Sequence, residues 1–82
     1  MQITVRYFAG AAQAAATTSE SIEISPGTTL EQLLAQLSQR SDELARVLAA
    51  SSYLINSRPA TDRNSVLDDG INLDVLPPFA GG

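Results

Sequence analysis

The chain has 82 residues, of which 44% are apolar, so it is long enough for one domain with a modest hydrophobic core. It contains no cysteine, histidine or lysine. This composition leaves no thiol nucleophile, no histidine base, no Schiff-base lysine, and no zinc or haem ligand set built from these side chains. We therefore expect the chain not to act as a catalyst by itself.

Charge and hydropathy restrict the partner classes. The net charge of −4 argues against nucleic acid, and it fits either a partner with a basic pocket or ordinary solubility. No apolar run approaches the roughly 20 residues of a membrane span, and the first residues do not follow the signal-peptide pattern. Asp68 and Asp69 are a turn pattern and too few for a metal site. These features predict a cytoplasmic protein with no membrane partner and no bound metal.

Two segments near the N-terminus alternate between apolar and polar residues, as half-buried strands do. In the first, residues 2–8, the inward side chains are Ile3, Val5 and Tyr7. Phe8 falls on the polar side of this strand. In the second, residues 20–25, the inward side chains are Ile22 and Ile24. Between them, residues 9–16 are rich in alanine but poor in large apolar groups, which predicts a loop with nascent helix.

The middle of the chain predicts one clear helix and, after it, a shorter helical turn. Pro26-Gly27 suits a type II turn, and Thr28 and Glu31 then have capping-box spacing. The buried stripe of the first helix follows the i, i+3, i+4, i+7 rule: Leu30, Leu33, Leu34 and Leu37. Ser41 is a suitable N-cap for a second, shorter helix. Its stripe consists of Leu44, Val47 and Leu48.

The C-terminal third predicts short elements joined by turns. They are a strand at 53–55, a turn at 56–59, a brief strand or single turn at 66–67, a turn at Asp69-Gly70 and a last strand at 71–76. The order of strands and helices indicates an α+β protein of the β-grasp (ubiquitin-like) class, in which one main helix packs on one face of a mixed sheet. The first and last strands are then parallel neighbours. An α+β sandwich of another topology is the alternative.

The C-terminal segment is unusual. Pro77-Pro78 ends the last strand, because proline cannot donate to a sheet ladder. Ala80, Gly81 and Gly82 then carry almost no side chain. We expect a β-grasp domain at residues 1–76 and a flexible arm at residues 77–82 that carries a free carboxylate on Gly82 into a narrow site on another protein. A frayed terminus is the alternative.

With this ending, the chain resembles the small, sulfur-carrier subunit of molybdopterin synthase (the MoaD type). The resemblance covers nearly the whole chain, and its most specific part is the Pro-Pro-x-x-Gly-Gly ending at residues 77–82. Its other supports are Phe8-Ala9, Thr29-Leu30-Glu31, the apolar strand into Asn56, and residues 67–70. The chain departs from the family at Ile71-Asn72, where another acidic pair is usual; this leaves the chemistry intact and makes the partner less certain.

The resemblance implies a role for the terminus. An E1-like activating enzyme would use ATP to adenylate Gly82, and a sulfurtransferase would supply the sulfur that replaces AMP. The resulting thiocarboxylate would enter the large subunit of molybdopterin synthase, which carries the catalytic residues and builds the dithiolene of molybdopterin from cyclic pyranopterin monophosphate. The resemblance implies no permanently bound cofactor. It leaves open a carrier for thiazole or cysteine synthesis, a ubiquitin-like modifier, and a non-covalent interaction module.

The period of two in a parallel pair of strands also predicts a docking surface. Thr4 should lie beside Asn72, Arg6 beside Asp74 and Phe8 beside Leu76, all on one face of the sheet. The first two pairs are polar, as a solvent-exposed face requires, and the third pair is apolar. We expect a partner-binding surface made of Phe8, Leu76, Pro77, Pro78 and Phe79. The alternative is that residues 9–16 fold back and cover Phe8.

Overall fold

Two strands from opposite ends of the chain lie side by side at the centre of the sheet. β1 (Gln2–Tyr7) and β5 (Asn72–Leu76) pair in parallel, with Thr4 opposite Asn72 and Tyr7 opposite Val75. The structure is a computed structural model, and it describes residues 1–78. In the described part the sheet has the order β2-β1-β5-β3-β4, with β2 (Ser19–Glu23), β3 (Ser52–Ile55) and β4 (Arg58–Pro59) all antiparallel to their neighbours. This is the predicted β-grasp topology.

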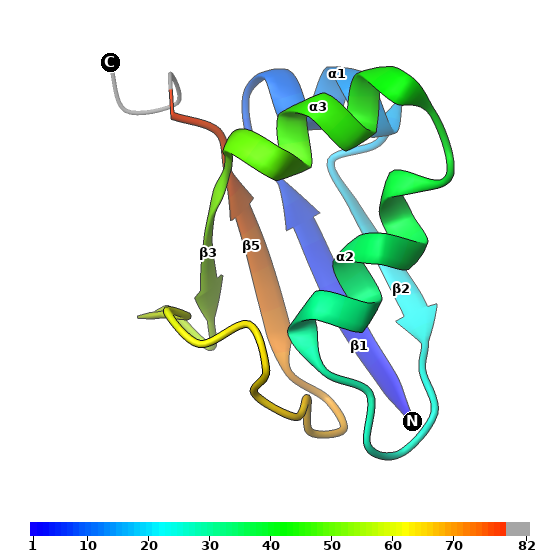
Figure 1. Ribbon diagram of the computed structural model, residues 1–82, viewed down its shortest axis with the longest axis vertical. Coiled ribbons are helices and arrows are strands. Elements are labelled where there is room, and N and C mark those ends of the chain that lie inside the picture. Colours follow the sequence, from blue (N-terminus) through cyan, green and yellow to red (C-terminus); the bar gives the residue numbers. More distant parts are fainter. Residues whose placement is uncertain (79–82) are drawn as a thin grey trace.

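The main helix, α2 (Leu30–Ser38), crosses one face of the sheet (Figure 1). All four leucines of its predicted stripe are buried, Leu30 and Leu33 completely. They pack in one hydrophobic core with the inward side chains of β1 and β5, namely Ile3, Val5, Tyr7, Leu73 and Val75. Burying each such leucine stabilises the fold by roughly 1.5–3 kcal/mol before the entropy cost of ordering the chain is subtracted.

The predicted capping box of α2 is wrong by one residue. The N-cap is Thr29, whose hydroxyl accepts a hydrogen bond from the Gln32 backbone N–H at 3.2 Å, while the Gln32 side chain accepts one from the Thr29 N–H at 3.0 Å. The Thr28 hydroxyl instead donates to the Ser25 carbonyl at 2.7 Å and so closes the preceding turn. Gly27 has φ 89° there, as a type II turn requires of its third residue. Thr28 is used by the turn and Thr29 therefore caps the helix.

The second predicted helical segment is confirmed as α3 (Asp42–Ala50), but α3 has nine residues and is as long as α2, not shorter. The Ser41 hydroxyl caps it by accepting from the Leu44 N–H at 3.0 Å. Leu44 and Leu48 are buried, and Val47 is partly buried against the same core. Asp42 and Glu43 lie in the first turn, where negative charge is favourable to the helix dipole.

The prediction of a loop with nascent helix at residues 9–16 understates the structure of this segment. Residues Gly10–Ala15 form a helix, α1, which lies against α3 at the end of the sheet where β1 and β5 finish (Figure 1). Ala11 is completely buried, and Ala16 closes the helix in a left-handed conformation with φ 61°. Alanine has the highest helix propensity, and its small side chain allows another helix to approach closely. Tertiary packing therefore replaces the large apolar groups that α1 lacks.

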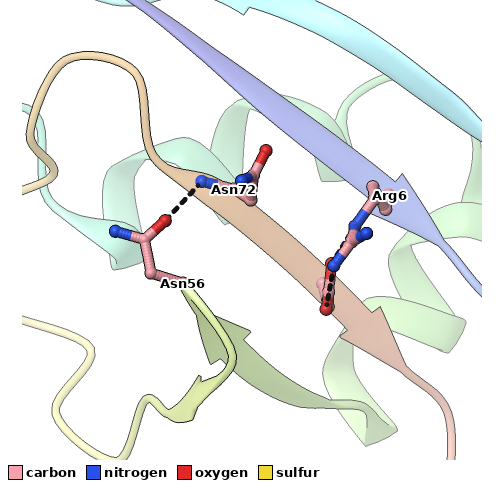
Figure 2. Close-up of polar contacts among 4 residues, drawn as sticks. Arg6, Asn56 and Asn72 are labelled. Carbon is pink, nitrogen blue, oxygen red and sulfur yellow. Dashed lines mark hydrogen bonds and ion pairs between the residues drawn. The ribbon is translucent and has the colours of Figure 1, made fainter.

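The predicted four-residue turn at 56–59 is shorter than expected. Asn56 and Ser57 alone make the turn, with φ values of 50° and 69°, and Arg58–Pro59 form the edge strand β4. Two residues with positive φ are typical of a tight hairpin connection. The Asn56 side-chain oxygen also accepts from the Asn72 N–H at 2.9 Å and so extends the pairing of β3 with β5 (Figure 2).

The turn before β5 sets the register of the central strands. The Asp69 carboxylate accepts from the Gln2 N–H at 2.8 Å, and the Gly70 N–H donates to the Gln2 carbonyl at 2.7 Å. Gly70 has φ 79°, a conformation that strains any residue with a Cβ atom. Val66, predicted in a brief strand or turn, makes an isolated bridge with Thr29. Within residues 1–78 no helix has the length and hydrophobicity needed to cross a membrane.

A polar cluster joins β1, β2 and the segment after α2. The Glu20 carboxylate accepts a hydrogen bond from the Tyr7 hydroxyl at 2.7 Å and one from the Arg40 guanidinium at 2.7 Å. The Arg40 hydrogen bond holds the pKa of Glu20 below its ordinary value of 4.5; burial opposes this effect and the Tyr7 hydrogen bond supports it. Burial in turn raises the pKa of Tyr7, which therefore remains a donor at neutral pH.

The lowered pKa of Glu20 predicts a pH-dependent stability. The folded-state pKa of Glu20 lies below its ordinary value of 4.5. The contribution of Glu20 to the free energy of unfolding is therefore fully present above pH 4.5, and it is lost as the pH falls through the lowered folded-state pKa. In urea unfolding at pH 7, Glu20→Gln should lower the free energy of unfolding by up to about 1 kcal/mol, the upper range for a partly exposed pair. The difference from the natural protein should shrink as the pH falls below the ordinary pKa of 4.5. A difference that stays constant would contradict this prediction, and Glu23→Gln, on the same strand, is the control.

Candidate functional site

The face of the sheet turned away from α2 carries the predicted alternation of side chains. The register confirms the expected pairs Thr4 with Asn72 and Arg6 with Asp74. The next strand, β3, places Leu54 opposite Asp74 and Ser52 opposite Leu76. Because side chains alternate between the two faces of a strand, these residues share one surface. We call this surface the open face.

An ion pair lies at the centre of the open face. The Arg6 Nε donates to Asp74 Oδ1 at 2.6 Å and its Nη2 donates to Oδ2 at 2.8 Å, so the pair is bidentate (Figure 2). The Asp74 side chain is only 8% exposed and that of Arg6 is 46% exposed. The hydrogen bond to Asp74 raises the pKa of Arg6. The prediction that both members of this pair are exposed to solvent is therefore wrong for Asp74, because the Arg6 guanidinium covers its carboxylate.

The open face becomes apolar where β1 and β5 end. Phe8 is 39% exposed, so α1 does not cover it, and the alternative in which residues 9–16 bury this ring is excluded. Regular pairing of the two strands stops at Tyr7 and Val75, and the Phe8 N–H donates to the Val75 carbonyl at 3.3 Å. Leu76 is half-buried. The Arg6 guanidinium lies 6.0 Å from the centroid of the Phe8 ring, which joins the ion pair to this apolar end.

The residues after β5 are only partly described. Pro77 is buried, so it is not an exposed member of the docking surface as predicted, and Pro78 is exposed. Phe79, Ala80, Gly81 and Gly82 lie outside the described residues, and the predicted flexible arm falls largely on them. Pro77 thus belongs to the folded domain, and Pro78, the last described residue, follows at the end of β5.

Sequence reasoning missed two features of this site. It placed Arg6 beside Asp74 but did not predict that the carboxylate is buried under the guanidinium; an opposite-charge pair in register was the available signal. It also assigned Leu54 only to an apolar strand, whereas the register puts this leucine on the open face beside Asp74. A pattern without alternation, such as Tyr53-Leu54-Ile55, cannot indicate which side chain faces outward.

The fold and the site together define a class. This is a ubiquitin-like β-grasp protein with an exposed aromatic ring, Phe8, at the end of its central strands, and its last strand is followed in the sequence by a Pro-Pro and Gly-Gly ending. The model of the ThiS family matches residues 5–82. The molybdopterin synthase sulfur carrier subunit of Chlamydomonas reinhardtii is 30% identical over 83 residues, and the match covers the whole of both chains.

Solved structures agree with this class. A chain of the complex between subunits 1 and 2 of the molybdopterin-converting factor of Helicobacter pylori has a TM-score of 0.74 and is 27% identical, with the whole of both chains covered. The small archaeal modifier protein 1 (SAMP1) of Haloferax volcanii has a TM-score of 0.83 at 21% identity, again over the whole of both chains, and shows the shared fold. The chain therefore belongs to the ThiS family. The resemblance of its sequence to the small, sulfur-carrier subunit of molybdopterin synthase is confirmed.

Proposed function

We propose that this protein is the sulfur carrier subunit of a molybdopterin synthase and that it carries sulfur as a thiocarboxylate on Gly82. The single observation that carries the proposal is the Pro-Pro-x-x-Gly-Gly ending directly after the central strand β5. Family membership and a full-length relative with this name support it.

The chemistry uses the terminus and requires no side-chain base on this chain. A terminal carboxyl ordinarily titrates near pH 3.5 or slightly lower, so at neutral pH it is an anion that can attack the α-phosphate of ATP. Pyrophosphate leaves, and the acyl-adenylate is an electrophile. Sulfur at the sulfide level (HS⁻) then attacks the acyl carbonyl, AMP leaves and a proton is released; a persulfide donor would instead form an acyl disulfide, which a thiol reductant must cleave to give the thiocarboxylate. Gly81 and Gly82 have no Cβ, so the reacting carbonyl can pass through a channel that a branched residue would block. The absence of cysteine from the chain is consistent with sulfur carried on the terminus.

The proposed partners follow from the same steps. An E1-like enzyme supplies the adenylation, a sulfurtransferase supplies the sulfur, and the large subunit of the synthase receives the arm and performs the dithiolene chemistry. The Helicobacter pylori complex of subunits 1 and 2 supports such a partner. The docking surface proposed for it is the apolar end of the open face, with Phe8 and Leu76 leading into Pro78 and Phe79. Pro77 is buried and does not belong to this surface.

A second candidate function is a ubiquitin-like modifier. The observation that favours it is the close match of the fold to SAMP1, since the same acyl-adenylate could be attacked by a target amine instead of by sulfur. A sulfur carrier for thiazole or cysteine synthesis is the related alternative within the family, because such carriers share the Gly-Gly ending. These functions differ in whether Gly82 donates sulfur or becomes bonded to a target amine, and in which molecule receives the sulfur.

Intact-mass spectrometry separates these functions. The chain is purified from its host and, in parallel, incubated with the activating enzyme, a sulfur donor and ATP. Exchange of a carboxylate oxygen for sulfur should add about 16 Da, and fragmentation should confine the change to the terminus. A reaction without ATP is the control. Products that contain a whole target protein would support the modifier, and an unchanged mass in every preparation would contradict the carrier.

A further inference from the structure

The ion pair at the centre of the open face has unused hydrogen-bond capacity. A guanidinium has five N–H groups, and Arg6 donates one from Nε and one from Nη2 to Asp74, which leaves three. Within residues 1–78 the Arg6 side chain makes no other hydrogen bond, and its 46% exposure leaves these donors in water. Asp74 fixes the guanidinium through two parallel bonds, so the remaining donors point in fixed directions.

A partner that docks on the apolar end must also cover Arg6. Its guanidinium is 6.0 Å from the centroid of the Phe8 ring, so a partner side chain that packs on the ring also lies beside the guanidinium, and Leu76 follows Asp74 on the same face. Covering Arg6 removes water from the three free N–H groups. Buried donors without acceptors are unfavourable, so a partner that binds well must replace the lost water with acceptors of its own.

We infer that the partner places a neutral oxygen acceptor, a backbone carbonyl or the side-chain amide oxygen of Asn or Gln, against Arg6, and that Arg6 thereby selects among partners. Asp74 already balances the charge of Arg6. A partner carboxylate would add an unbalanced charge to a neutral pair in a dry interface, and its desolvation would cost more than the extra attraction supplies. The net charge of −4 also repels an acidic surface. The inference rests on the proposed function, and the partner meant is the large synthase subunit.

Calorimetric titration of the purified large subunit with variants of this chain tests the inference. The double variant Arg6→Met with Asp74→Leu removes the donors and the charge together, and it should bind about tenfold more weakly because the partner's acceptor is left unpaired. Asp74→Asn leaves the Arg6 cation buried without a balancing charge, and it should bind about 30-fold more weakly or worse. Phe8→Ala tests the docking surface itself. Circular dichroism and urea unfolding verify that each variant is folded.

Each outcome has a distinct meaning. Tighter binding by Asp74→Asn would show a carboxylate opposite Arg6 and overturn the neutral acceptor. Unchanged binding by the double variant, with weaker binding by Phe8→Ala, would make the ion pair purely structural and overturn the inference while the docking surface stands. If Phe8→Ala also binds normally, the proposed docking surface is wrong and the inference fails with it, whereas the mass test of Gly82 is unaffected. Should Asp74→Asn not fold, the apolar double variant still decides whether the ion pair contributes to binding, and unchanged binding by it would overturn the inference.

Discussion

Removal of Gly82 is expected to abolish sulfur transfer while leaving the folded domain intact. The deletion moves the terminal carboxylate back by one residue, about 3.5 Å along an extended chain, and acyl transfer tolerates little displacement of the reacting group. The core that the structure describes lies between Ile3 and Val75, so its packing does not depend on the last residue. The measurement is product formation by the reconstituted synthase, and activity should fall by at least about 100-fold.

The same variant provides its own control for folding and docking. The Gly82-deleted chain should unfold at the same urea concentration as the natural protein and should compete with it for the large subunit, because the open face is unchanged. Gly82→Val is a second test: it keeps the length and adds a branched side chain, and it should also be inactive. Normal transfer by the deleted chain would disprove the carrier function.

Replacement of Leu33 by alanine should produce a large loss of stability. Leu33 is completely buried in the core between α2 and the sheet. Truncation of a buried leucine to alanine removes its burial and leaves a cavity, which together lower the free energy of unfolding by about 2–5 kcal/mol. Small domains have total stabilities of only about 5–15 kcal/mol, so Leu33→Ala should remove a large fraction of the total and unfold at a much lower urea concentration.

Urea unfolding followed by circular dichroism measures this effect. Gln36→Ala, on the exposed side of the same helix, is the matched control and should change the free energy of unfolding by less than about 0.5 kcal/mol. A midpoint for Leu33→Ala equal to that of the control would mean that the predicted core is not formed around α2.

Several features of this protein were determined by local patterns in the sequence. The leucine stripe of α2 and the alternation in β1 each predict a buried face, because side-chain direction follows the helix and strand periods. The cap at Ser41 and the turn at Asp69-Gly70 have short-range causes and were predicted correctly. The ending at residues 77–82 indicated the family without any knowledge of the fold.

Other features could be decided only by the tertiary structure, because they depend on contacts between distant segments. Residues 10–15 form a helix since α3 provides a surface for alanine side chains, and Thr29 becomes the cap since Thr28 is engaged in the preceding turn. Asp74 is buried because Arg6, 68 residues away in the chain, lies across it. The sequence shows that residue 74 is an aspartate. Its burial beneath a guanidinium at the centre of the open face depends on the register of β1 against β5, which pairs it with Arg6.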